Sequence, residues 1–374
     1  MSSARPIMVG SVAVGGGAPV TVQSMTCTRT GDAQATLAQV RALAAAGCEL
    51  VRVSLPEADD VEAFGRVVRA SPVPIIADIH YDRRLALAAI EAGAAGIRIN
   101  PGTMAETHVR EIVRAAEEAR VPTGGGGEAG QPAAAGQADV PVAIRIGVNA
   151  GSLPRDLRGK AEREPAAALV EAALRWAAQF DEWGFDAYKL SVKSSSVPTT
   201  IAAYRLLAER SEAPLHVGVT EAGTVWSGTI KSAVGIGALL AEGIGDTIRV
   251  SLTGDPVEEV RVAWKILAAL GLRQRGPDVI SCPTCGRTEV DIVGLAEEVE
   301  RRLGADEALA GLTITVAVMG CRVNGPEEAR HADYGIAAGA GEGVLFDHGR
   351  RVEALPEGQL VDALLTRIRA AATG

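Results

Sequence analysis

The chain has 374 residues, of which 47% are hydrophobic and only 3% aromatic, and its formal net charge is −9. This length suits two domains, one of them large. The acidic balance and the scarcity of aromatic rings argue against a nucleic-acid-binding surface. The sequence shows neither an apolar leader nor a run of about 18 apolar residues, so we expect a soluble cytoplasmic protein that does not enter a membrane.

Short β-branched runs alternate with Ala/Leu-rich segments of helical periodicity through most of the chain. The predicted strands are Val20–Met25, Leu50–Ser54, Val73–Ile79, Gly96–Asn100, Val142–Val148, Ala187–Val192, Leu215–Val219 and Thr247–Leu252. The predicted helices are Ala35–Ala46, Val61–Ala70, Arg83–Ala92, Thr107–Ala119, Ala166–Trp183, Pro198–Arg210 and Thr229–Leu240. Eight β/α units in about 250 residues are typical of a TIM (β/α)8 barrel. A doubly wound sheet normally has fewer strands, and the G-x-G-x-x-G turn that often follows its first strand is missing here.

One segment interrupts this rhythm. Residues 123–139 are rich in Gly, Ala and Gln and have no periodic apolar face. Because such a segment buries too little surface to offset its ordering entropy, we predict a disordered insertion. Its glycines are not followed by Lys-Ser/Thr, so it is not a phosphate-binding P-loop.

A smaller α/β domain is predicted after the barrel. Residues 273–277 resemble a linker, which divides the chain into a substrate-binding barrel domain, 1–272, and a second domain, 273–374. The second domain has one predicted helix and three predicted strands, at Val290–Leu303 and at Leu312–Met319, Tyr334–Ala338 and Gly343–Phe346.

Polar side chains end almost every predicted barrel strand, and in a TIM barrel this is where the chemistry occurs. They are Arg52 and Ser54; Asp78 and His80; Arg98 and Asn100; Arg145 and Asn149; Lys189, Ser191 and Lys193; His216 and Glu221; Arg249 and Ser251. A surface charge or an internal salt bridge would explain any one of them. Asp78 and His80 are conceivable metal ligands but lack a third ligand at helical spacing. Several cations on one rim of an acidic protein instead favour a multiply charged anion such as a diphosphate.

Three cysteines cluster in the second domain, in the motif Cys282-Pro-Thr-Cys285-Gly and at Cys321. With no fourth cysteine nearby, they suggest an iron–sulfur cluster that an oxygen or nitrogen ligand completes, leaving one iron open to substrate. Zinc could instead take the three thiolates with His331 or His348. A reversible dithiol or three buried thiols are further alternatives, although the neighbouring Pro and Gly favour exposed turns.

Several motifs, in order and across nearly the whole chain, resemble the bacterial 4-hydroxy-3-methylbut-2-enyl diphosphate synthases. They are VQSMT (22–26), ADIH (77–80), RINPG (98–102), RIGVNAGSL (145–153), KLSVKSS (189–195), GVTEAG (218–223), GDTIRVSLTGDP (245–256), CPTCGR (282–287) and GCRVNGPEEA (320–329). These synthases are reductive iron–sulfur enzymes of the methylerythritol phosphate route to isoprenoids.

The resemblance implies a site in each domain. A 4Fe-4S cluster would be ligated by Cys282, Cys285, Cys321 and Glu328, with Glu327 at a position that is usually Gly in the family. Glu221 would be the essential acid near the reacting carbons. The residues that would contact the substrate's diphosphate and hydroxyl groups are Arg52, His80, Arg98, Arg145, Asn149, Lys193, Arg249 and Ser251.

The implied reaction opens 2-C-methyl-D-erythritol 2,4-cyclodiphosphate with two electrons and releases 4-hydroxy-3-methylbut-2-enyl diphosphate. Reduced flavodoxin or ferredoxin would supply the electrons, and a head-to-tail homodimer is expected. Two other readings remain open at this stage. One is a barrel that binds a phosphorylated metabolite, with a structural zinc knuckle. The other is a zinc-supported aldolase that forms a Schiff base on Lys189 or Lys193.

Overall fold

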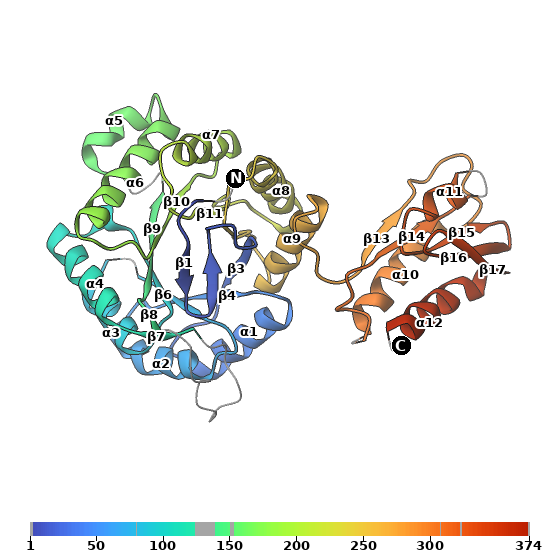
Figure 1. Ribbon diagram of the computed structural model, residues 1–374, viewed down its shortest axis with the longest axis horizontal. Coiled ribbons are helices and arrows are strands. Elements are labelled where there is room, and N and C mark those ends of the chain that lie inside the picture. Colours follow the sequence, from blue (N-terminus) through green and yellow to red (C-terminus); the bar gives the residue numbers. More distant parts are fainter. Residues whose placement is uncertain are drawn as a thin grey trace. The chain divides into compact units, whose positions relative to one another are not determined.

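The structure is a computed structural model. It describes residues 3–79, 81–123, 139–149, 153–306, 308–321 and 324–372. His80 and nearly all of the predicted insertion therefore lie outside the described residues. The chain divides into two compact units, Met1–Arg273 and Gln274–Gly374 (Figure 1). Arg273, the first residue of the predicted linker, belongs to the first unit because it pairs with Glu49 at 2.9 Å.

The first unit is a ring of eight parallel strands, which confirms the predicted TIM barrel (Figure 1). The strands follow the order β10-β9-β6-β5-β4-β3-β12-β11, and a parallel bridge between Leu190 and Leu215 links the two end strands. Their bounds are β3 Thr21–Met25, β4 Leu50–Ser54, β5 Ile75–Asp78, β6 Gly96–Ile99, β9 Ala143–Asn149, β10 Tyr188–Lys193, β11 His216–Val217 and β12 Thr247–Ile248. The last two are shorter than predicted, because the apolar run continues into buried loop residues such as Val219 and Val250.

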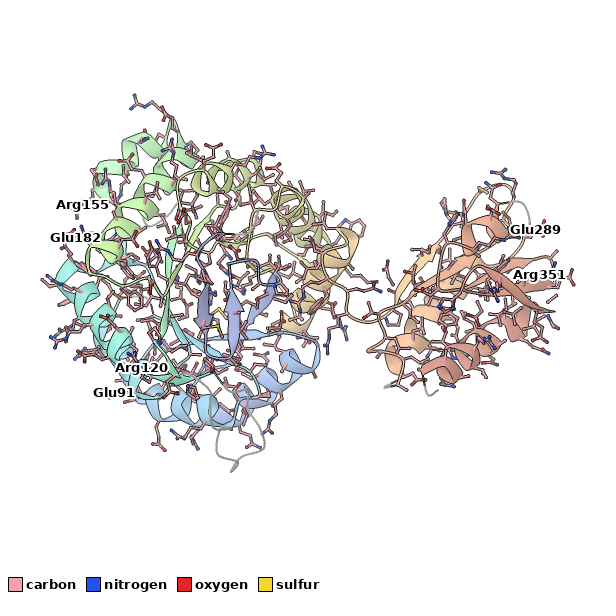
Figure 2. The ribbon with its side chains drawn as sticks, in the orientation of Figure 1. Glu91, Arg120, Arg155, Glu182, Glu289 and Arg351 are labelled. Atoms are coloured by element: carbon pink, nitrogen blue, oxygen red, sulfur yellow. The ribbon has the colours of Figure 1, made fainter. Side chains whose placement is uncertain are left out.

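Helices surround the strands, and each predicted helix has a counterpart. They are α1 Ala33–Ala45, α2 Val61–Ala70, α3 Arg83–Glu91, α4 Glu106–Glu118, α5 Arg158–Ala161, α6 Pro165–Glu182, α7 Val197–Ala208, α8 Val225–Ala241 and α9 Pro256–Ala269. Asp82 and Asp255 cap α3 and α9 by accepting backbone N–H bonds, as short acidic side chains do at helix starts. Charged side chains such as Glu91 and Arg155 lie on the outside of this ring (Figure 2). Among the described helices, none has the length and apolar character needed to cross a membrane.

An amino-terminal hairpin, β1 (Ile7–Val9) and β2 (Val12–Val14), was not predicted. Its Gly10 turn has φ +57° and approaches Ala95 and Pro74 so closely that an added Cβ would lie 3.1–3.2 Å from theirs. Both of these residues directly precede barrel strands, so the hairpin lies at the amino end of the ring. Its buried side chains join the barrel core there, which leaves the carboxyl end for chemistry.

The second unit is a five-stranded mixed sheet in the order β13-β14-β15-β16-β17. The first three strands are parallel and the last two are antiparallel to their neighbours. Its elements are β13 Asp278–Ser281, α10 Ile292–Ala305, β14 Thr315–Met319, α11 Gly325–Ala329, β15 Tyr334–Gly339, β16 Glu342–Asp347, β17 Arg350–Pro356 and α12 Leu360–Ala372. Of these, β13, α11, β17 and α12 were not predicted.

Alternating residues of β14 divide the core of this unit. Val316 and Val318 pack on the side of α10 and α12, whereas Ala317 and Met319 pack with Ala329 of α11 on the other. This alternation is the expected period of a strand that is buried on both faces. The loops after β13 and β14 thus leave the sheet side by side at its carboxyl edge.

Candidate active site

Cationic side chains fill the inside of the barrel toward its carboxyl end. Arg52, Arg98, Arg145, Lys189 and Lys193 are all buried, with at most 9% of their surface exposed. The strand register places Arg98 beside Arg145 and Arg145 beside Lys189. Four of these five belong to the set predicted to bind substrate, and the fold brings all of them together.

Only part of this charge is balanced within the barrel. Asp78 lies between Arg52 and Arg98, at 3.6 and 3.4 Å. Glu259 of α9 lies 3.3 Å from the half-buried Arg249. Within the described residues these carboxylates face a larger number of cations, which is the electrostatic pattern of an anion site.

Glu259 fixes the position of Arg249, and the sequence interpretation missed it. Its carboxylate also accepts from the Ser24 hydroxyl at 2.8 Å and from the Leu252 backbone N–H at 3.0 Å. Only 4% of the residue is exposed. Its signal in the sequence is an acid on the apolar stripe of a helix, beside Val260. A buried carboxylate with three partners is a rigid anchor for the arginine.

Burial makes the charged form of these side chains unfavourable. Desolvation, followed by the neighbouring Arg52 and Arg98, holds the pKa of Arg145 well below its usual value. Desolvation, followed by Arg145, does the same to the pKa of Lys193. Within the described residues no acceptor reaches Arg98 Nε, Arg145 Nε and Nη2, or Lys189 Nζ. An anion with several acceptor oxygens would relieve both the repulsion and the missing hydrogen bonds.

Lys193 has an internal acceptor. Its Nζ lies 3.1 Å from His216 Nε2, and His216 Nδ1 lies 2.8 Å from Thr247 Oγ1. Desolvation, followed by the charge on Lys193, holds the pKa of His216 well below its usual value, so the ring is neutral. We assign the proton to Nδ1, which lets Nε2 accept from the lysine.

Two glycines leave room for these long side chains. A Cβ at Gly147 would lie 2.9 Å from Arg98 Nε. A Cβ at Gly218 would lie 2.7 Å from Lys193 Nζ and 2.4 Å from the Arg249 carbonyl oxygen. Both positions therefore require glycine for close packing rather than for an unusual φ.

Glu221 follows β11 in a left-handed backbone conformation, with φ +53°. It is exposed, and its loop is held by a hydrogen bond from Thr220 N–H to the Ser194 carbonyl at 3.2 Å. A non-glycine residue in this region costs energy and is found preferentially at functional sites. Asn149 and Ser251, at the end of β9 and after β12, are half-buried.

The cysteines gather at the carboxyl edge of the second unit's sheet. Cys282 directly follows β13, and Cys321 comes two residues after β14, its parallel neighbour. Gly320 N–H donates to Cys282 Sγ at 3.3 Å. Hydrogen bonds, chiefly from the Arg287 backbone and side chain, lower the pKa of the exposed Cys285 thiol. Backbone donors and a lowered pKa both favour the thiolate form that binds metal.

Two carboxylates of α11 follow these cysteines and differ in their surroundings. Glu327 pairs with Arg330 at 3.2 Å, whereas the exposed Glu328 side chain has no hydrogen bond or ion pair within the described part of the chain. The Glu328 carboxylate is therefore freer than that of Glu327 to bind a metal. The donor set of three thiolates and one carboxylate fits an iron–sulfur cluster, although no three such side chains converge closely enough to form a preformed metal site among the described residues.

The sheet topology argues against His348 as a fourth zinc ligand. His348 lies in the turn between β16 and β17, and its Nδ1 lies 2.6 Å from Asp347. Asp347 pairs with Tyr334 at the amino end of β15, and β15 is parallel to β14. His348 is thus at the opposite edge of the sheet from Cys321.

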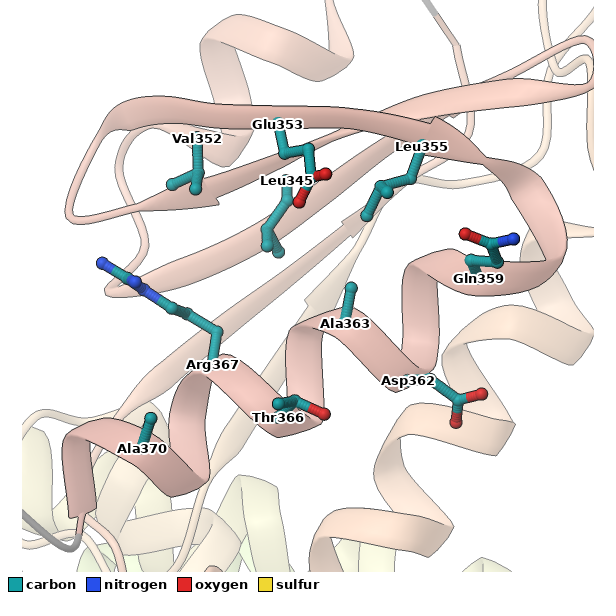
Figure 3. A pocket seen from close by; sticks show the side chains of 10 residues that line it. All are labelled: Leu345, Val352, Glu353, Leu355, Gln359, Asp362, Ala363, Thr366, Arg367 and Ala370. Carbon is teal, nitrogen blue, oxygen red and sulfur yellow. The ribbon is translucent and has the colours of Figure 1, made fainter.

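A separate groove of about 480 Å³ lies between α12 and strands β16 and β17 (Figure 3). Leu345, Leu355 and Ala363 form its apolar part. Two of the charged lining residues have partners elsewhere, since Arg367 pairs with Asp347 and Asp362 with Arg302. None of the predicted site residues lines it, and we assign it no role.

We predict that Glu221→Gly stabilises the barrel by about 0.5–1 kcal/mol, because glycine adopts φ +53° without the strain of a side chain. Urea unfolding monitored on the barrel tests this. The matched control is Glu209→Gly, an exposed position with φ −71°, where glycine only adds chain entropy and should destabilise. Equal destabilisation by both changes would contradict stored strain at Glu221.

Comparison with known proteins identifies the family. Residues 4–264 match the GcpE TIM-barrel domain and residues 278–370 the GcpE protein C-terminal domain. The chain is 54% identical to the 4-hydroxy-3-methylbut-2-en-1-yl diphosphate synthase (flavodoxin) of Geobacter sulfurreducens over 97% of this chain and 96% of the relative. It is 52% identical to that of Salinispora arenicola (97% and 87%) and 48% identical to that of Aquifex aeolicus (98% and 96%). The chain therefore belongs to the GcpE family, the 4-hydroxy-3-methylbut-2-en-1-yl diphosphate synthases.

Proposed function

We propose that this protein reductively opens 2-C-methyl-D-erythritol 2,4-cyclodiphosphate and releases 4-hydroxy-3-methylbut-2-enyl diphosphate, an isoprenoid precursor. The observation that carries the proposal is the set of buried barrel cations, several of whose N–H groups have no acceptor within the described residues. A cyclic diphosphate offers several anionic oxygens in a compact group, which matches that set in charge and in hydrogen-bonding capacity.

The barrel residues hold the substrate. In this proposal the diphosphate and hydroxyl groups are contacted by Arg52, His80, Arg98, Arg145, Asn149, Lys193, Arg249 and Ser251. Asp78 and Glu259 keep three of the arginines in place, so little side-chain freedom is lost on binding. Such preorganisation uses binding energy to position the carbon–oxygen bond that must break.

Glu221 acts as the proton donor to the departing hydroxyl, which leaves as water. A carboxylic acid in reach of the leaving oxygen is a common general acid. Its strained backbone is consistent with a position that is selected for chemistry at a cost in stability.

Cys282, Cys285, Cys321 and Glu328 would hold a 4Fe-4S cluster. When bound, such a cluster supplies low-potential electrons one at a time and a Lewis-acidic iron with an exchangeable ligand. The relatives are flavodoxin enzymes by name, so reduced flavodoxin is the proposed electron donor, with ferredoxin as the alternative. Thiolate ligands need a reducing compartment, in keeping with a cytoplasmic location.

Anaerobic purification tests the function. We expect brown protein with about four iron and four sulfide per chain that converts the cyclodiphosphate when reduced flavodoxin is added. Arg145→Ala should lose about 1.5–3 kcal/mol of substrate binding and keep its iron, whereas Arg261→Ala, an exposed position on α9, should match the wild type. Colourless protein with stoichiometric zinc and no turnover would overturn the proposal.

Glu328 is the predicted fourth ligand. Glu328→Ala should give a labile cluster that loses iron in air-free buffer, followed by absorbance and electron paramagnetic resonance, and should abolish turnover. Glu327→Gly removes only an exposed ion pair, worth less than about 1 kcal/mol, and should keep both. The reverse outcome would mean that Glu327 is the ligand.

We also propose that the protein is a homodimer. On α8, Trp226, Ile230 and Val234 are 80%, 48% and 54% exposed. Their spacing of four residues places them on one helix face, and Lys231 is the only charged residue of α8. An apolar stripe of this kind is typical of an interface, and a two-fold axis would pair it with itself.

Ile230→Asp should produce a monomer in sedimentation experiments at a concentration where the wild type is a dimer, because a buried unpaired carboxylate is costly. Leu272→Asp is the matched control, since Leu272 is 45% exposed in the same unit but lies off the stripe. A monomeric wild type, or dimerisation that Ile230→Asp leaves unchanged, would refute this interface.

A further inference from the structure

Among the buried cations in the described part of the barrel, Lys189 is the one that neither the proposed binding set nor an internal partner accounts for. It lies on β10 in register with Arg145 of β9, and only 2% of its surface is exposed. Its Nζ has no acceptor within the described residues. A lysine normally keeps its ammonium hydrated or paired, so its burial here requires an explanation.

The groups that face Lys189 are mostly cationic. Arg145 and Arg52 disfavour its charge, and Asp246, just before β12, favours it. Asp246 is already used by other donors, because it accepts from Leu215 N–H at 2.8 Å and from the Ser3 hydroxyl at 2.6 Å. Desolvation is the largest cause of the shift, and together these effects lower the pKa of Lys189 to about 7.

The nearby Lys193 and His216 complete these surroundings. Lys193 lies four residues further along β10, on the same face of the strand. It has His216 Nε2 as an acceptor at 3.1 Å, and His216 is neutral. Lys193 thus has a hydrogen-bond acceptor, whereas no acceptor among the described residues lies within hydrogen-bond distance of Lys189 Nζ.

We propose that Lys189 is an additional binding residue for the anionic substrate, neutral in the free barrel and protonated when a diphosphate binds. This inference rests on the proposed function. The proton comes from the solvent and forms an N–H bond with the amine lone pair. The negative charge of the ligand then compensates the ammonium and the surrounding arginines.

The direction of the linkage follows from the burial. Because the pKa of Lys189 is depressed in the free protein, binding raises it, and protons are taken up at any pH between the two values. With a free pKa of about 7 and full protonation in the complex, Lys189 itself should take up about 0.9 proton at pH 8 and about 0.1 at pH 6. The cyclic diphosphate itself does not titrate in this range, so the change belongs to the protein.

The experiment is calorimetric titration of the anaerobic holoenzyme with the cyclodiphosphate at pH 8, in Hepes and in Tris, whose ionisation enthalpies differ and neither of which is an oxyanion of phosphorus. The measured quantity is the number of protons taken up on binding. Lys189→Arg should bind with about 0.9 fewer protons than the wild type, because arginine is charged before binding. Lys189→Met should show the same loss of uptake and a Kd raised at least tenfold. Lys265→Met, at an exposed position on α9, is the control and should match the wild type.

Wild-type uptake in Lys189→Arg would overturn the inference, as would a difference in uptake between wild type and Lys189→Arg that does not fall between pH 8 and pH 6. Lys189→Met gives the same readout independently, so misfolding of one Lys189 variant does not leave the question open. Failure of the proposed function has a different signature. If the cyclodiphosphate does not bind but inorganic diphosphate does, the substrate assignment fails, while the difference in uptake between wild type and Lys189→Arg still decides the role of Lys189.

Discussion

The repulsion between desolvated cations inside the barrel is the constraint on which the rest of the site depends. Arg52, Arg98 and Arg145 are held on β4, β6 and β9 with little access to water, and Asp78 of the intervening β5 offsets only part of their charge. A barrel of this kind tolerates such a cluster because eight hydrogen-bonded strands and an apolar shell fix the backbone around it. The stability of the barrel fold holds together a charge arrangement that is unfavourable until an anion binds.

The second unit also uses parallel strands to bring functional loops together, but for a different kind of ligand. Its parallel strands β13 and β14 bring two loops to one edge of a sheet, just as the barrel strands bring their ends to one rim. There the loops carry soft sulfur donors, and the exposed Cys285 and Glu328 remain accessible. The barrel is thus suited to hard phosphate oxygens, whereas this edge is suited to iron.

Much of this arrangement could be predicted from the sequence. The β/α alternation predicted the barrel because parallel strands buried on both faces read as short apolar runs. Because the chemistry of a TIM barrel occurs where its strands end, the polar residues at the predicted strand ends then selected Arg52, Arg98 and Arg145 without any contact information. The family resemblance, which the relatives confirm, added Glu221 and Glu328 as candidates.

The missed features depend on long-range contacts. The hairpin at Ile7–Val14 reads as two short apolar pieces, and only its packing under the barrel makes it a structural element. The partners of Glu259 come from residues as far away as Ser24, 235 positions apart. Strand β17 is almost entirely exposed, so it shows no apolar alternation by which it could be recognised. Local patterns cannot report such pairings.

One contact at the amino end of the barrel connects Ser3 with the surroundings of Lys189. Ser3 donates both its backbone N–H and its hydroxyl to Asp246, at 3.1 and 2.6 Å, and Asp246 supplies the negative potential beneath Lys189. Ser3 therefore helps to set the charge balance deep inside the barrel. A change at Ser3 would alter the electrostatic field at Lys189 from the amino end of the barrel, the side opposite to the rim on which the strand ends gather.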